Sequence, residues 1–346
     1  MNVFLLCLFA MMLYRCKLAP VNTYHIDYLS HKNTVLINGV FVILVYLSHS
    51  SAKCALTNSM DQFYILFKQH LLQLVVVTFL FYSGYGMCVS LMNKKGYADS
   101  LMKIRLPKLF VHFNIAILLY LIVQFFLGKV YKLPYILKAM IGWSSVGNSN
   151  WYIFVMLLLY VLLWISCKIF KKPQHAIHLT TLLTILYIVF MIKKGMPTRF
   201  YNTILCFNLG MYYALCKSRI EKIVMKNDIH YLMTLFISLG LYKLFFNLKT
   251  EHIVYYILWT FIFMVIVLLI SMKFSMNSPI LKWFGTNIFG VYILQRIPIN
   301  ILCALGFQKQ SYLFIVVCLV ITTVMTLVFN QCLKKVDQVL FSRKKA

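Results

Sequence analysis

A succession of apolar runs, most of them close to the length of a membrane-spanning helix, restricts the fold of this chain more than any motif does. The hydrocarbon core of a bilayer is about 30 Å thick, so a helix needs about 20 apolar residues to cross it. The chain is 62% hydrophobic and 12% charged over 346 residues, which excludes an ordinary soluble domain. The runs cover 2–14, 34–50, 70–90, 110–128, 151–167, 177–192, 201–216, 231–248, 252–271, 284–305 and 312–332.

These runs predict an all-α polytopic integral membrane protein with about 10–11 transmembrane helices in one bundle. No segment between them is long enough for a separate globule, so we expect a single membrane domain over 1–346. It comprises an extra amino-terminal anchor and loop (1–33), a helical core (34–333) and a basic cytoplasmic tail (334–346). The first run precedes the earliest charge, Arg15, so we interpret it as a retained anchor and not as a cleaved signal peptide.

The basic residues of the loops predict the orientation. Loops 15–32, 94–108, 168–172, 217–226 and 273–282 and the tail hold 22 Lys and Arg, the opposite loops hold 11, and Arg296 lies within a span, which completes the 34 in the chain. The positive-inside rule places the first set and the carboxyl terminus in the cytoplasm. A cytoplasmic membrane, most simply a bacterial one, is the expected location.

The net charge of +27 would suit a nucleic-acid binder, but the charges are spread over many short loops. That pattern is typical of membrane topology and anionic lipid contact, so we predict membrane lipid and no nucleic acid as partners. The ten cysteines show no CxxC pair and no Cys/His cluster with ligand spacing. We therefore predict no disulfide and no metal.

His49 is the first candidate for chemistry. It stands at the far end of the run that begins after Lys32, roughly 25 Å away along a helix, near the outer edge of the hydrocarbon. An imidazole near neutral pH is suited to act as a general base. The plainer interpretation, a histidine that marks a helix end at the membrane interface, stays open.

Two further places carry unusual charges. Arg105 and Lys108 are spaced to share one face of a helix entering the membrane, where they would hold phosphates or simply anchor the helix in the positive side. Gln295 and Arg296 interrupt an apolar run just before Pro298, which should kink the helix and free backbone carbonyls. Arg296 would satisfy those carbonyls or face a ligand.

The order of these pieces resembles the acyltransferase 3 family of polytopic membrane O-acyltransferases, and the resemblance covers most of the chain. Three matching features are a histidine ending the first conserved helix, a Ser-Gly pair after the next helix, and an RxxR-like pair. In this chain they are His49 in "VFVILVYLSHS", Ser83-Gly84 in "FYSGYGM", and Arg105 with Lys108. Three longer segments also match: "GNSNWYIFVMLLLY", "FYNTILCFNLGMYY" and "FGTNIFGVYILQRIPINIL".

Three positions depart from the family pattern. Asn38 stands where many members have Arg or Lys, Lys108 replaces the second arginine of RxxR, and Gln295 follows Tyr292 where many members have Tyr-x-x-His. The first departure weakens an ion-binding role for position 38. The last leaves His49 as the strongest histidine candidate for a base.

The resemblance implies transfer of an acetyl or other small acyl group from cytosolic acetyl-CoA to a hydroxyl of a cell-surface polysaccharide or its lipid-linked precursor. Arg105 and Lys108 would bind the CoA phosphates, and His49 would deprotonate the acceptor or, alternatively, carry the acetyl group itself. Candidate orienting or oxyanion partners of His49 are Asp61, Asn150, Trp151, Gln295 and Arg296. A transporter or flippase for an envelope glycan precursor and a non-catalytic scaffold remain as alternatives.

Overall fold

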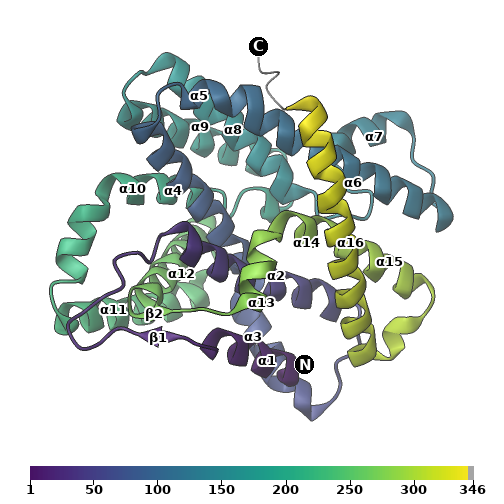
Figure 1. The fold of residues 1–346 in the computed structure, drawn as a ribbon, viewed down its shortest axis with the longest axis horizontal. Helices are drawn as coiled ribbons and strands as arrows, with labels where there is room; N and C mark the ends of the chain where they lie inside the picture. The colour runs from purple at the N-terminus through teal and green to yellow at the C-terminus, as the bar shows by residue number, and fades with distance from the viewer. Residues whose placement is uncertain (342–346) are drawn as a thin grey trace.

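The computed structural model describes residues 1–341, and it is almost entirely helical (Figure 1). Within that range the only strands are β1 (Lys17–Leu18) and β2 (Phe274–Ser275), which form a short antiparallel ribbon. Residues 342–346 of the predicted basic tail lie outside the described residues. The predicted class, an all-α polytopic membrane protein, is confirmed.

Within residues 1–341, eight helical stretches are long and apolar enough to cross a membrane. Two of them are built from several segments: Ser59–Asn93 joins α3 and α4 through a 3-10 turn, and Tyr97–Phe126 joins α5 and α6 through a π-helical turn. The helices in these eight stretches are α2 (His31–Ser51), α3 (Gln62–Leu71), α4 (Val77–Asn93), α5 (Tyr97–Ser100), α6 (Leu106–Phe126), α8 (Trp151–Ile169), α9 (Pro173–Lys193), α11 (Asp228–Leu248), α12 (Ile253–Lys273) and α16 (Ser311–Leu340).

The prediction of about 10–11 spans was too high, because the structure has eight, or nine if the bent pair below counts as one span. The run at 2–14 forms α1 (Asn2–Leu13), whose 12 residues rise about 18 Å and are too few to cross. The run at 201–216 continues into the charged second half of α10 (Leu205–Val224), which is not among the apolar candidates. The shorter helices are α7 (Leu133–Met140), α13 (Pro279–Thr286), α14 (Ile288–Leu294) and α15 (Arg296–Ala304).

The run at 284–305 is not a straight span. It bends by 70° between α13 and the stretch formed by α14 and α15. A second interruption lies at Gln295, between α14 and α15. Pro298 has no N–H to donate to the carbonyl of Leu294, four residues earlier, so the regular helix is weakened where α14 ends. The 70° bend falls at Asn287, well before Pro298, and beside the proline the structure shows only the interruption at Gln295.

Helix α2 is the central element of the bundle. Of its most apolar window 72% is buried within the protein, against 11% for α11 at the periphery. Ser30 caps its amino end by accepting a hydrogen bond from the backbone N–H of Asn33. In Figure 1, α2 and α13 lie near the middle, with α11 and α12 on the left and α6, α7 and α15 on the right. Most side chains along α2 are therefore enclosed by other helices.

Glycines bring two helix pairs into close contact. A methyl group added to Gly39 of α2 would lie 2.0 Å from the Leu281 carbonyl oxygen of α13, and one on Gly285 would lie 1.8 Å from the Val35 oxygen. Small residues let helix backbones approach in this way, as is typical of membrane bundles.

The same arrangement joins α4 to α10. A methyl group on Gly84 would lie 1.9 Å from the Phe207 oxygen, and one on Gly210 would lie 2.1 Å from the Phe81 oxygen. Gly84, Gly210 and Gly285 all belong to the segments that carry the family resemblance. Part of that resemblance thus reflects helix packing.

Contacts between loops agree with the grouping derived from charge. Lys168 pairs with Asp99, and Lys108 with Asp337 of α16, which joins three of the segments assigned to the cytoplasm. The β1–β2 ribbon joins loops 15–32 and 273–282, and Lys273 pairs with Asp228. These contacts therefore join the segments into two local groups.

Candidate functional site

His49 lies two residues before the end of α2, and its side chain is half-buried. Its Nδ1 atom is buried and has no hydrogen-bond partner within the described part of the chain. The charges of Arg296 and Lys68 act on the imidazole, and the Gln295 side chain lies next to it. The structure thus brings together three residues that the sequence singled out, His49, Gln295 and Arg296, from two segments about 250 positions apart.

The interruption between α14 and α15 sets the direction of Gln295 and Arg296. The Gln295 amide donates to the Tyr292 carbonyl oxygen at 3.0 Å, and the Tyr120 hydroxyl of α6 donates to the Ile293 oxygen at 2.7 Å. Polar side chains therefore donate to two carbonyls just before the interruption, and Arg296 is not one of these donors. The Oε1 atom of Gln295 is buried without a partner.

Arg296 instead reaches the loop that precedes α8. Its Nη1 donates to the Asn148 carbonyl oxygen at 3.4 Å, and Asn300 donates to the Gly147 oxygen at 3.2 Å. Gly147 has a φ of +100°, and a methyl group there would lie 2.4 Å from Nε2 of Gln124. This glycine lets the loop pack against α6 and α15 beside Arg296.

Several polar atoms in this region are buried and unpaired. In a membrane domain such groups are costly, because neither lipid nor the surrounding helices offer hydrogen bonds. We call the following set the polar centre: His49, Gln124, Asn148, Ser149, Gln295 and Arg296. Within it Nδ1 of His49, Oε1 of Gln124, Nδ2 of Asn148, Oγ of Ser149 and Oε1 of Gln295 lack partners. A polar ligand would supply the missing hydrogen-bond partners.

Asn150 and Trp151, two of the predicted partners, have other contacts. The Asn150 amide donates to the Gly142 oxygen at 2.7 Å, so that donor is already used to shape the loop. Trp151 packs edge-on against Tyr152 at a ring-centroid distance of 6.0 Å. Among the predicted oxyanion donors, Arg296 is the one whose charge lies beside His49.

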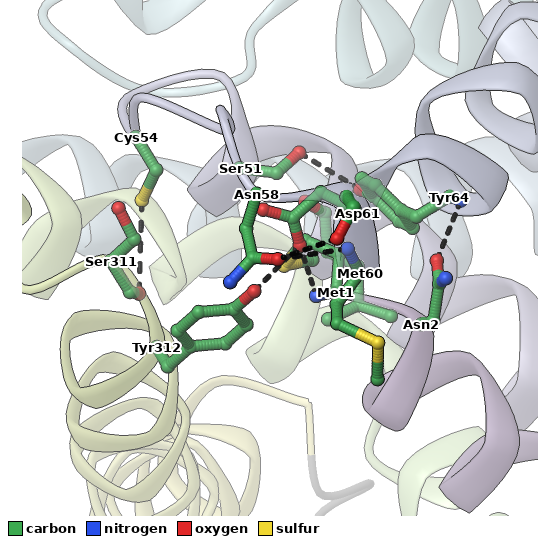
Figure 2. Close-up of polar contacts among 12 residues, drawn as sticks. Met1, Asn2, Ser51, Cys54, Asn58, Met60, Asp61, Tyr64, Ser311 and Tyr312 are labelled. Carbon is green, nitrogen blue, oxygen red and sulfur yellow. Dashed lines mark hydrogen bonds and ion pairs between the residues drawn. The ribbon is translucent and has the colours of Figure 1, made fainter.

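Asp61 is engaged elsewhere, as Figure 2 shows. Its Oδ1 atom accepts from the Met1 amino group at 2.5 Å and from the Tyr312 hydroxyl at 2.8 Å. No contact among the described residues joins it to His49. The predicted role of Asp61 in orienting the imidazole therefore has no geometric support, because its acceptor oxygen is used to tie three chain segments together.

Arg105 and Lys108 lie at the amino end of α6, whereas Gln124 of the polar centre lies near its carboxyl end. The two basic side chains contact different partners. Arg105 is exposed and stacks over the Tyr97 ring at 5.0 Å. Lys108 pairs with Asp337 at 2.6 Å, and His112 contacts the same carboxylate at 2.8 Å. We call Arg105 and Lys108 the basic mouth. From Arg105 to the level of Gln124 a helix rises about 28 Å, so the basic mouth and the polar centre are separated by most of the thickness of a bilayer.

Sequence reasoning did not identify Gln124, Asn148, Ser149 or Lys68. Gln124 interrupts the apolar run "LIVQFF", so a search for polar residues within spans would have found it. Asn148 and Ser149 belong to a quoted segment, but only the folded loop reveals their burial.

Comparison of the chain with family models, with curated proteins and with solved structures found no match. Within residues 1–341 no group of three or more His, Cys, Asp or Glu residues could hold a metal ion. The placement of the polar centre is therefore the main ground for a functional proposal.

Proposed function

We propose that this protein is a membrane O-acyltransferase that moves an acetyl or small acyl group from cytosolic acyl-CoA to a hydroxyl of an envelope glycan or its lipid-linked precursor. The observation that carries the proposal is the unpaired, buried His49 Nδ1 beside Gln295 and Arg296. Ionisable groups enclosed in a membrane domain are usually functional. The ordered resemblance to the acyltransferase 3 family supplies the reaction class.

In the proposed reaction the His49 imidazole takes the proton of the acceptor hydroxyl as its oxygen attacks the thioester carbonyl carbon. Negative charge develops on the former carbonyl oxygen, where the Arg296 guanidinium stabilises it. The carbon–sulfur bond then breaks, and the CoA thiolate takes the proton from the imidazolium. The products are the acylated glycan and free CoA.

The donor would enter at the basic mouth. Arg105, which is exposed, is the cation best placed for a CoA phosphate, whereas Lys108 would have to exchange Asp337 for it. The thioester arm would then extend along α6 toward the polar centre. CoA suits this path because its phosphates lie at one end of the molecule and its thioester at the other.

The test uses membrane vesicles with labelled acetyl-CoA and cell glycan. His49→Ala should lower the rate of label transfer by about 10²–10⁴, the usual contribution of a general base. His31→Ala is the matched control, because His31 is exposed at the opposite end of the same helix. Transfer by His49→Ala at the native rate would refute the proposal.

A transporter or flippase is the second candidate, because broken helices at membrane depth are typical of transporters. The 70° bend before α14 and the interruption at Gln295 are the observations that favour it. Movement of unmodified glycan across the vesicle membrane, independent of acetyl-CoA, would support transport. Glycan that gains an acetyl group only with the native chain would support the enzyme.

A further inference from the structure

An apolar groove opens between α1 and the core of the bundle. Its volume is about 700 Å³, and side chains of α1, α2, α3 and α12 line it. The lining includes Leu6 and Phe9 of α1, Leu44 of α2, Leu71 of α3 and Ile266 of α12. Along α1 it extends from Asn2 to Met12, a rise of about 15 Å. Its elongated shape and apolar walls suit a hydrocarbon chain.

One end of the groove leads to a lysine. Leu44 and Leu71 line both the groove and a small recess that also contains Ser48 and Lys68. Lys68 is half-buried, and its Nζ donates to Ser51 Oγ at 3.0 Å. In the described part of the chain no carboxylate forms an ion pair with it. The recess therefore places an unmatched positive charge at the end of an apolar channel.

Asp61, at the start of the helix that carries Lys68, is the carboxylate closest to Lys68 in the sequence. It is instead held by Met1 and Tyr312, while Ser51 also contacts the Tyr64 hydroxyl at 2.8 Å (Figure 2). These contacts keep the carboxylate away from the lysine. Lys68 thus keeps donor capacity for an anion from outside the chain.

We propose that this groove binds the hydrocarbon chain of a lipid-linked glycan acceptor and that Lys68 binds the phosphate that joins chain to sugar. Lys68 contacts Ser51, the last residue of the helix that carries His49, and Ser48 beside His49 lines the same recess as Lys68, so a phosphate on the lysine would bring the adjoining sugar to the imidazole. The inference rests on the proposed function and narrows its acceptor from a free glycan to a polyprenyl-phosphate-linked one.

The arrangement of charge selects this occupant. A free glycan has no apolar part to fill the groove. Acyl-CoA is a poor occupant, because Arg105 and Lys108, which are proposed to bind its phosphates, do not line the groove. An ordinary phospholipid would match the chain and the phosphate, but it brings no acceptor sugar to His49. The contiguous series of groove, Lys68 and His49 fits a molecule with a chain, a phosphate and a sugar in that order.

Binding is measured directly with the full-length protein in phosphatidylcholine nanodiscs and labelled polyprenyl phosphate. Lys68→Met should weaken binding by about tenfold, the loss of one charge-assisted hydrogen bond, and Lys68→Arg should restore most of it. Lys53→Met is the control, because Lys53 is exposed and lies outside the groove. Unchanged binding by Lys68→Met would overturn the proposal.

A second pair of variants tests the groove itself. Leu6→Trp should fill it and weaken binding, whereas Leu13→Trp, on the same helix but outside the lining, should not. Equal competition by phosphatidylglycerol would show a general lipid site and overturn the assignment to an acceptor. Equal binding by both tryptophan variants would also overturn it.

Failure of this inference and failure of the proposed function give different results. His49→Ala should bind polyprenyl phosphate like the native chain, because His49 does not line the groove. Normal lipid binding by the native chain without any acetyl transfer would retain the lipid site and refute the enzyme. Transfer to free glycan that ignores Lys68→Met would retain the enzyme and refute the lipid site.

Discussion

The basic mouth and the polar centre differ in whether their charged and polar groups have partners within the protein. At the mouth, Asp337 accepts from Lys108 at 2.6 Å and contacts His112 at 2.8 Å. At the centre, Arg296 donates to a backbone oxygen at 3.4 Å, and five neighbouring polar atoms have no hydrogen-bond partner among residues 1–341. Matched charges stabilise a fold, whereas buried unmatched groups cost free energy unless a ligand satisfies them.

This difference separates two kinds of conspicuous residue. Lys108, a motif position, forms an ion pair with Asp337 that joins α6 to α16. Arg296 has no carboxylate to offset it among residues 1–341. We therefore expect substitutions at the polar centre to change activity more than stability, and substitutions at the mouth to do the reverse.

Apart from His49, the largest effect that this comparison predicts is at Arg296. Arg296→Met should lower the rate of acetyl transfer by about 10²–10³, because it removes the positive charge proposed to face the oxyanion. The amount of folded protein in membranes should stay close to native. The control is Arg199→Met, since Arg199 is exposed on a loop. A native rate with Arg296→Met would remove Arg296 from the reaction.

A smaller effect is expected at Gln124, which is 2% exposed and has an unpaired Oε1. Gln124→Leu keeps the approximate volume and removes a buried polar group, so thermal stability should be unchanged or higher. If a ligand normally pairs with that oxygen, the rate should fall by about tenfold. Gln69→Leu, at an exposed position, is the control. A drop in stability with a native rate would show that Gln124 is purely structural.

The sequence predicted the elements of the site better than their contacts. Apolar run length located the spans, and the polar interruption at Gln295 and Arg296 marked the broken helix, because both signals are local. His49 was identified as an ionisable group at a helix end. That these residues meet depends on how α14 and α15 pack against α2, which no local pattern encodes.

The errors have the same origin. Asp61 is near His49 in sequence and was proposed as its partner, yet it binds Met1 and Tyr312 from distant segments. The run at 2–14 is apolar throughout, but α1 is too short to cross and lies beside the groove instead. Pairing partners and helix depth are properties of the folded chain.

The smallest predicted effect tests whether Lys108 of the basic mouth binds the acyl donor in addition to joining α6 to α16. Asp337→Asn frees Lys108, whose ammonium is then available to a CoA phosphate, so the KM for acetyl-CoA should fall by up to about fivefold, the value of a surface ion pair. Asp99→Asn is the matched control, because Asp99 pairs with exposed Lys168 on a neighbouring loop. Lys108→Met should raise KM modestly if Lys108 contacts the donor. A KM that responds to neither Asp337→Asn nor Lys108→Met would assign the pair to structure alone and leave Arg105 as the donor-binding cation.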